Sequence, residues 1–232
     1  MHERCLDQNL PDLVHRIHDQ LLPGLRLHSA DPHDPVRVLS LRQPWRSLGC
    51  GNYAAVLNHP HHPDLVVKVY APGRAGWQQE AEVYRRIGTH PSFTQCFHVG
   101  EGYLVLGRLH GTTFYDCLRK GIPIPPGAIA DIDAGLAYAV SRGLHGNDVH
   151  GRNVMVHQER GLIADISDFL DPQPCRAWQD LRWAYHTVYR PLIAPLGLRV
   201  PGPVLDGVRR SYRLYRRLRA WGEAAGPPAR LG

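Results

Sequence analysis

Apolar residues at the start of the chain recur at steps of three and four positions, which is typical of one face of a helix. This helix is expected to act as a packing element and to end at Pro23-Gly24. Its apolar positions are Leu10, Leu13, Val14, Ile17 and Leu21. Prolines and aspartates then predict a loop over 31–44. Apolar runs over 48–56 and 65–70 predict two strands joined as a hairpin.

The pattern then changes from strands to helices. A helix is predicted over 77–87, and two further strands are predicted over 93–98 and 103–106. Beyond Gly111, most of the chain has helical periodicity. The elements expected there are helices over 129–141, 178–188 and 204–221 and short strands at 154–156 and 162–164. This order predicts an α+β protein with a small antiparallel β lobe, which carries one helix, and a mostly α lobe.

Composition limits the class of protein. The chain has 232 residues, 43% of them hydrophobic and 21% charged, and no run nears the roughly 18 apolar residues that span a bilayer. We therefore expect a soluble globular protein. Lys and Arg number 27 against 21 Asp and Glu, which favours anionic partners. The N-terminus lacks the apolar stretch of a signal peptide, so we expect a cytoplasmic location, with peripheral contact at the inner membrane as an alternative.

The cysteines and histidines do not form a metal-binding pattern. The five cysteines lie far apart without a C-x-x-C pair, which argues against a zinc ribbon or a redox motif. His59, His61 and His62 follow one another in a proline-rich connection between the two strands of the hairpin. Because no carboxylate cluster accompanies them, we expect a solvated loop there and not a metal site.

Two glycines and a lysine are candidates for phosphate contact. Gly49 and Gly51 stand one residue apart, where missing side chains let backbone N–H groups approach phosphate oxygens. A hairpin turn without a ligand has the same pattern. Lys68 lies in the middle of the next apolar strand, where burying an unpaired ammonium would be costly.

The following helix offers Glu80 and Glu82 as partners for Lys68. A strand lysine that is paired with a helix glutamate and touches nucleotide phosphates is the arrangement that phosphoryl-transfer enzymes use. The alternative is an edge strand on which Lys68 points into solvent.

The most specific pattern lies in the second half. Asp148 is followed five positions later by Asn153 and twelve positions after that by Asp165, at the end of a short apolar strand. This spacing supplies a base for a hydroxyl and two oxygen ligands for Mg²⁺. Asp168, three positions further on, is an alternative metal ligand, and Asp165 is preferred because it directly follows the strand. Without the preceding motifs, a polar loop between two strands would explain the same residues.

In this order the motifs resemble the protein-kinase-like superfamily, over about 47–189. The resemblance implies a two-lobed kinase-like fold, with an N-terminal helical extension over 1–40, an N-lobe over 41–110 and a C-lobe over 111–232. It also implies ATP and Mg²⁺ as cofactors. The implied roles are a glycine-rich loop with Gly49, Gly51 and Ala54, the strand lysine Lys68, the helix glutamate Glu80, the catalytic Asp148, the metal ligands Asn153 and Asp165, a hinge for adenine that includes Leu106 and Arg108, and Asp180 as a buried brace for the catalytic loop.

Two features depart from protein kinases. His150 stands where they commonly carry lysine, and Asp180 follows Asp165 by only fifteen positions, without an A-P-E motif, so the activation segment is minimal. In the first feature the chain is similar to aminoglycoside phosphotransferases and to lipopolysaccharide-core sugar kinases. We expect transfer of the γ-phosphate of ATP to a hydroxyl, with a protein Ser or Thr as first choice, as in minimal bacterial kinases. The alternatives are a lipopolysaccharide-core sugar or another small molecule as acceptor, and a pseudokinase that binds nucleotide without catalysis.

The last predicted helix is amphipathic and basic. Its apolar face carries Val204, Val208, Tyr212, Tyr215 and Leu218, and its other faces carry Arg209, Arg210, Arg213, Arg216, Arg217 and Arg219. It predicts either a helix packed on the α lobe or a patch for anionic lipid, lipopolysaccharide or an acidic protein. Nucleic acid is not favoured, because no stacking motif accompanies the arginines.

Overall fold

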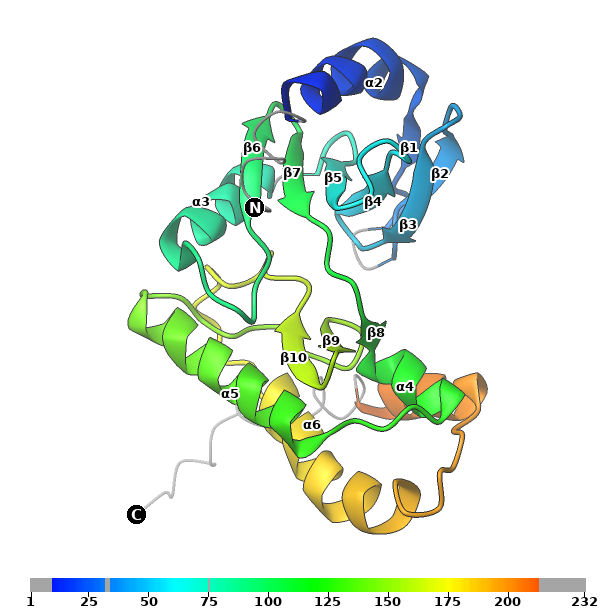
Figure 1. Ribbon diagram of the computed structural model, residues 1–232, viewed down its shortest axis with the longest axis vertical. Helices are drawn as coiled ribbons and strands as arrows, with labels where there is room; N and C mark the ends of the chain where they lie inside the picture. Colours follow the sequence, from blue (N-terminus) through cyan, green and yellow to red (C-terminus); the bar gives the residue numbers. More distant parts are fainter. Residues whose placement is uncertain (1–9, 32–33, 75, 213–232) are drawn as a thin grey trace, which may run out of the picture.

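The computed structural model describes residues 10–31, 34–74 and 76–212. Figure 1 shows a part rich in strands, which carries α2, β1 to β7 and α3, above a part that carries β8 to β10 and α4 to α6. The predicted α+β class, with a strand-rich part and a mostly helical part, is confirmed. In the described residues, we find no helix that combines the length and the apolar character needed to cross a membrane.

The upper part is built on an antiparallel sheet of five strands. Its order is β3-β4-β5-β7-β6. The strands are β3 (Arg46–Cys50), β4 (Ala54–Asn58), β5 (Leu65–Tyr70), β6 (Cys96–Gly100) and β7 (Tyr103–Gly107). Lys68 lies in the central strand, opposite Val56 of β4 and Leu104 of β7. The lysine is therefore surrounded by sheet on both sides and does not lie on an edge strand.

Both faces of the central strand β5 are covered. Because side chains alternate along a strand, Leu65 and Val69 face the cluster that contains the N-terminal helix, while Val66 and Tyr70 face the cluster that contains α3 (Trp77–Ile87). This explains why the strand is apolar at nearly every position. Lys68 shares the α3 face, so it is directed toward the interior between sheet and helix.

The N-terminal segment packs on the sheet, as predicted, but is not only helical. Residues 10–24 form a helix that includes a π-helical turn, η1 (Ile17–Leu21), and ends with α2 (Leu22–Gly24). A small hairpin of β1 (Arg26–His28) and β2 (Arg37–Ser40) follows. The loop predicted over 31–44 is therefore wrong in part.

The predicted strand over 48–56 is also wrong. The chain turns at 51–53, and the two halves of the run pair with each other as β3 and β4. The turn is closed by the Gly51 N–H, which donates to the Ala54 carbonyl at 2.9 Å.

The histidine loop between β4 and β5 is not solvated as predicted. His59 and His62 are buried, and only His61 is exposed. His62 Nε2 lies 2.9 Å from Asp12 Oδ2, so the N-terminal helix covers the connection. Among the described residues, no three His, Cys, Asp or Glu side chains form a group that could hold a metal ion.

The lower part combines a small sheet with helices. Its elements are β8 (Thr112–Thr113), α4 (Phe114–Lys120), α5 (Pro126–Ser141), β9 (Val154–His157), β10 (Arg160–Ile163), α6 (Ala177–Ala184), a π-helical segment η2 (Tyr185–Ile193) and a helix over 202–212. The sequence pattern missed α4. Its signals are short-range: Thr113 caps the helix by accepting from the Asp116 N–H, and Gly121 ends it in a left-handed conformation.

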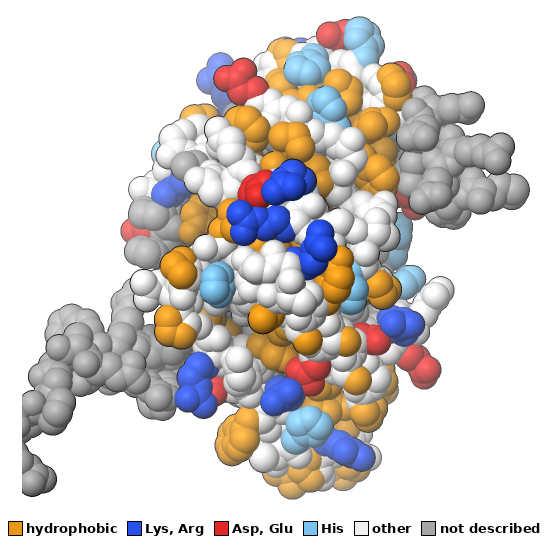
Figure 2. All heavy atoms as spheres, turned by 90° about the vertical axis from the view of Figure 1, so that its left-hand side faces the viewer, with side chains coloured by type: hydrophobic (Ala, Val, Ile, Leu, Met, Phe, Trp, Pro, Cys, Tyr) orange, Lys and Arg blue, Asp and Glu red, His pale blue; other side chains and the backbone are white. Residues whose placement is uncertain are grey.

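Hydrogen bonds join the two parts along α3 and α5. Tyr138 donates its hydroxyl hydrogen to the Ile87 carbonyl at 2.7 Å, and Arg142 Nε donates to the Arg86 carbonyl at 2.7 Å. Figure 2 shows the side of the molecule that carries α3, with Lys and Arg side chains gathered near its middle. The helix α3, which supplies Glu80, is therefore held by residues of and just after α5 as well as by the sheet.

Gly161 of β10 allows close packing on α5, which makes a test of this architecture possible. A Cβ at this position would overlap the Ala128 carbonyl oxygen, a backbone atom that cannot rotate away. We expect Gly161→Ala to lower the free energy of unfolding by about 3 kcal/mol in urea denaturation. Gly127→Ala is the matched control, because its Cβ would make only an ordinary contact, 3.7 Å from the Glu159 carbonyl oxygen. Equal stability of the two variants would contradict the packing described here.

Candidate active site

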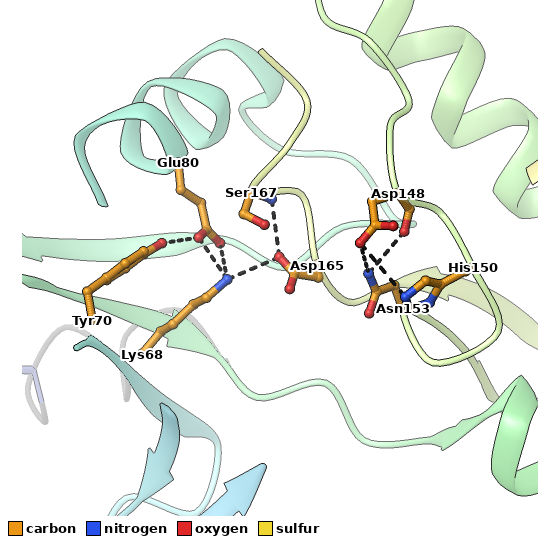
Figure 3. Close-up of polar contacts among 8 residues, drawn as sticks. All are labelled: Lys68, Tyr70, Glu80, Asp148, His150, Asn153, Asp165 and Ser167. Atoms are coloured by element: carbon orange, nitrogen blue, oxygen red, sulfur yellow. Dashed lines mark hydrogen bonds and ion pairs between the residues drawn. The ribbon is translucent and has the colours of Figure 1, made fainter. Parts of the chain in front are cut away.

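A buried ion pair joins the sheet to α3. The buried stripe of α3 contains Glu80, Val83, Tyr84 and Ile87, so the helical repeat directs Glu80 at the sheet. Lys68 Nζ lies 2.9 Å from Glu80 Oε1 and 2.7 Å from Oε2, and Glu80 is 0% exposed (Figure 3). The Tyr70 hydroxyl donates to the same carboxylate. Of the two glutamates that the sequence offers, only Glu80 meets Lys68, because Glu82 pairs with arginines on the surface.

The same lysine reaches the second part of the molecule. Its Nζ lies 3.1 Å from Asp165 Oδ1, and that oxygen also accepts from the Ser167 N–H at 3.1 Å. Asp165 follows β10, so one ammonium group connects the central strand, α3 and the segment after β10 (Figure 3).

Burial and the neighbouring charges together set the pKa values of Lys68, Asp165 and Glu80. Burial alone would lower the pKa of Lys68, but the Asp165 and Glu80 carboxylates outweigh it and raise that pKa. Burial would raise the pKa of Asp165, and Lys68 reverses the effect, so its pKa is lowered. Burial raises the pKa of Glu80 against the opposing effect of Lys68. Lys68 and Asp165 are therefore held in their charged forms.

A tight loop brings Asp148 and Asn153 together. The Asn153 side-chain amide donates to the Asp148 carbonyl at 3.0 Å and to its carboxylate at 3.5 Å. His150 Nε2 lies 3.8 Å from the same carboxylate (Figure 3). Asp148 has a φ of 54°, a left-handed conformation that is uncommon for residues other than glycine. Such strain is found where the surrounding structure fixes a functional residue.

Asn147 ties this loop to the segment after Asp165. Its buried side-chain amide donates to the Asp171 carbonyl at 2.6 Å and to the Gln173 carbonyl at 2.9 Å. Sequence reasoning missed this role, since the only signal was a polar residue just before Asp148. The two loops that carry the candidate site residues therefore form one unit.

Three carboxylates of this unit lie close enough to affect one another. Burial, and then the charges of Asp148 and Asp165, raise the pKa of Asp168 to about 6. No three of the described acidic, His or Cys side chains form a metal site by themselves, but Mg²⁺ needs only one or two carboxylates together with phosphate oxygens and water. The residues present fit Mg²⁺, with Asn153 and Asp165 as the predicted ligands and Asp168 as the alternative.

A cavity of about 350 Å³ opens beside these residues. Its walls come from the turn after β3, the start of α3 and the segment after Asp165, through Tyr53, Tyr70, Gly76, Gln79, Ser167, Asp168, Leu170 and Asp171. The size lies in the range of small-molecule sites.

The chain was compared with family models and with curated proteins. No family model matches the chain. A protein of Bacillus subtilis (strain 168), described as "Putative serine/threonine-protein kinase YrzF", is 28% identical over 151 residues, which cover 64% of this chain and 69% of that protein. The chain is thus similar to a protein that is named as a putative kinase.

Solved structures include kinase-like neighbours as well. The Mycobacterium tuberculosis PknI kinase domain matches with 25% identity and a TM-score of 0.43, covering 66% of this chain and 63% of that domain. A second crystal structure of the same kinase domain matches with 26% identity and a TM-score of 0.41, covering 56% of this chain and 60% of that domain. The chain thus spans less than two thirds of the length of these domains. The name of the Bacillus subtilis relative is that of a kinase, the enzyme class expected from the sequence of this chain.

The predicted nucleotide-binding residues are spread along the sheet. Gly49 lies in β3 with open space where a Cβ would stand, as a close phosphate contact requires. Ala54 is buried in the core. Leu106 is buried at the end of β7, and the Arg108 N–H already donates to the Asp64 carbonyl at 2.7 Å. The adenine contacts predicted at these residues stay a prediction.

The structure changes one expectation for the second half of the chain and describes only part of another. Asp180 is half-buried, and its carboxylate accepts from the Tyr212 hydroxyl at 2.7 Å, so it is not the buried brace that the resemblance implied. The basic helix is described only over 202–212, where Val204 and Val208 are exposed. Tyr215, Leu218 and the arginines from Arg213 onward lie outside the described residues, and contact with lipid stays a prediction.

Asp168 gives this site a testable pH dependence in the metal-free protein. Its pKa of about 6 exceeds the value of about 3.9 in an unfolded chain, so its contribution to stability is lost as pH rises through this window. We expect Asp168→Asn to raise the melting temperature at pH 7.5 by about 2 to 4 °C and to change little near pH 4, in calorimetry with EDTA. The control is Asp19→Asn, at an exposed position on the N-terminal helix. A gain of the same size at both pH values would contradict repulsion among the carboxylates.

Proposed function

We propose that this chain is an ATP- and Mg²⁺-dependent phosphotransferase that moves the γ-phosphate of ATP to a hydroxyl, most directly a Ser or Thr of a protein. Residues 41–110 would form its N-lobe and 111–232 its C-lobe. The observation that carries the proposal is the position of Lys68 Nζ between Glu80 and Asp165, beside the loop that holds Asp148 and Asn153. The name of the Bacillus subtilis relative supports the choice of Ser and Thr.

In this proposal each residue has a separate task. Asp148 orients the acceptor hydroxyl and takes its proton as the hydroxyl oxygen bonds to the γ-phosphorus and the bond to the β–γ bridging oxygen breaks, which releases ADP. Lys68, fixed by Glu80, contacts the phosphates and offsets their charge. Asn153 and Asp165 would hold Mg²⁺, which neutralises charge on the phosphate oxygens when bound. The turn after β3 closes over the phosphates from the other side.

The task of Asp148 gives the decisive test of this function. Asp148→Asn keeps the size of the side chain but removes the proton acceptor, so we expect phosphate transfer to fall at least about 1,000-fold. Purified protein with Mg²⁺ and γ-labelled ATP is incubated with a cell extract, and labelled fractions are separated. Asp19→Asn is the matched control and should label as the wild type does.

The fraction that takes up label distinguishes the acceptors. Label in protein bands that disappears with Asp148→Asn supports a Ser/Thr protein kinase, whereas label in glycolipid or small metabolites would move the acceptor to a sugar. Equal labelling by Asp148→Asn and the wild type would overturn the assignment of Asp148. No labelling by the wild type would contradict the proposed activity and favour a nucleotide-binding pseudokinase.

A further inference from the structure

An arginine of the catalytic loop is held from outside the loop. The guanidinium of Arg152 lies 3.6 Å from the centre of the Tyr115 ring, and its Nη2 lies 2.9 Å from Asp206 Oδ1. The Tyr115 hydroxyl donates to the same Asp206 oxygen at 3.2 Å. Arg152, Tyr115 and Asp206, from the loop, α4 and the helix over 202–212, therefore form one closed cluster, which we call the loop brace.

The brace acts on the residues that carry the proposed chemistry. Arg152 directly precedes Asn153, and the Tyr115 N–H donates to the Gly151 carbonyl at 2.8 Å. The loop is thus bonded to α4 through the Gly151 carbonyl and to Asp206 through the Arg152 side chain. A shift of Arg152 would move the Asn153 side chain relative to the Asp148 carboxylate, to which it donates at 3.5 Å.

The helix over 202–212 also binds Asp180, the residue that was expected to brace this loop. Asp180 accepts from Tyr212, at the end of that helix, while Asp206 reaches the loop itself. The same helix therefore contacts both α6 and the catalytic loop. The support that the resemblance assigned to Asp180 comes here from Asp206.

We propose that Asp206 is a positioning residue, which acts through Arg152 to hold Asn153 in register with Asp148. The effect on transfer rests on the proposed function, whereas the effect on the loop does not. The Arg152 and Asp206 side chains are 41% and 44% exposed, and such exposed pairs contribute little to global stability. The expected consequence is a change in loop order and in metal use, with little change in melting temperature.

The test compares Asp206→Ala with a control substitution of Arg119, which also lies against the Tyr115 ring. Arg119 lies 5.8 Å from the Tyr115 ring and pairs within α4, so Arg119→Gln alters the same surface without touching the loop. Amide hydrogen exchange of residues 146–153 is followed in the full chain without ligand. We expect exchange about tenfold faster in Asp206→Ala and unchanged in Arg119→Gln. Asp206→Asn, which keeps the shape, provides a second variant, and Asp206→Glu should restore most of the protection.

Kinetic measurements then report on the metal. In Asp206→Ala we expect kcat about tenfold lower, a raised half-saturating Mg²⁺ concentration and a nearly unchanged KM for ATP, as for residues that orient metal ligands. Unchanged exchange over 146–153 in both Asp206→Ala and Asp206→Asn would overturn the brace. If the wild type transfers no phosphate but exchange still rises in the variants, the brace stands and the proposed function fails.

Discussion

The structure depends on where the charge of Lys68 is placed. An ammonium in the central strand of a covered sheet costs several kcal/mol unless anions meet it. Glu80 and Asp165 meet it from two different elements, so the pairing fixes α3 against the sheet and the segment after β10 against both. A requirement of one strand position thereby becomes a constraint on how the two parts of the molecule meet.

The candidate site follows from that constraint. Once Asp165 is held by Lys68, Asn147 binds the following segment and so brings the loop of Asp148 and Asn153 alongside. The carboxylates that gather there repel one another, which the raised pKa of Asp168 records. A metal-bound polyphosphate is the type of ligand that would relieve this repulsion while also contacting Lys68.

Some of this could be predicted from the sequence because it is set by local periodicity. The sequence predicts the helix over 77–87 with its observed bounds, because its buried positions recur at helical spacing. Glu80 lies on the same buried stripe. The split of 48–56 into β3 and β4 was missed because the apolar pattern continues through the turn. The burial of His59 and the partner of Asp180 could not be predicted, since both depend on distant helices that cover them.

The central claim is that Lys68, Asp165 and their neighbours form a site for Mg²⁺ and ATP. The most direct measurement is calorimetric titration of the wild type with ATP, with Mg²⁺ and with EDTA, alongside Asp165→Asn. We expect ATP to bind about tenfold or more tightly with Mg²⁺, and this gain to disappear in Asp165→Asn. The absence of ATP binding to the wild type, or an unchanged gain in the variant, would contradict the account.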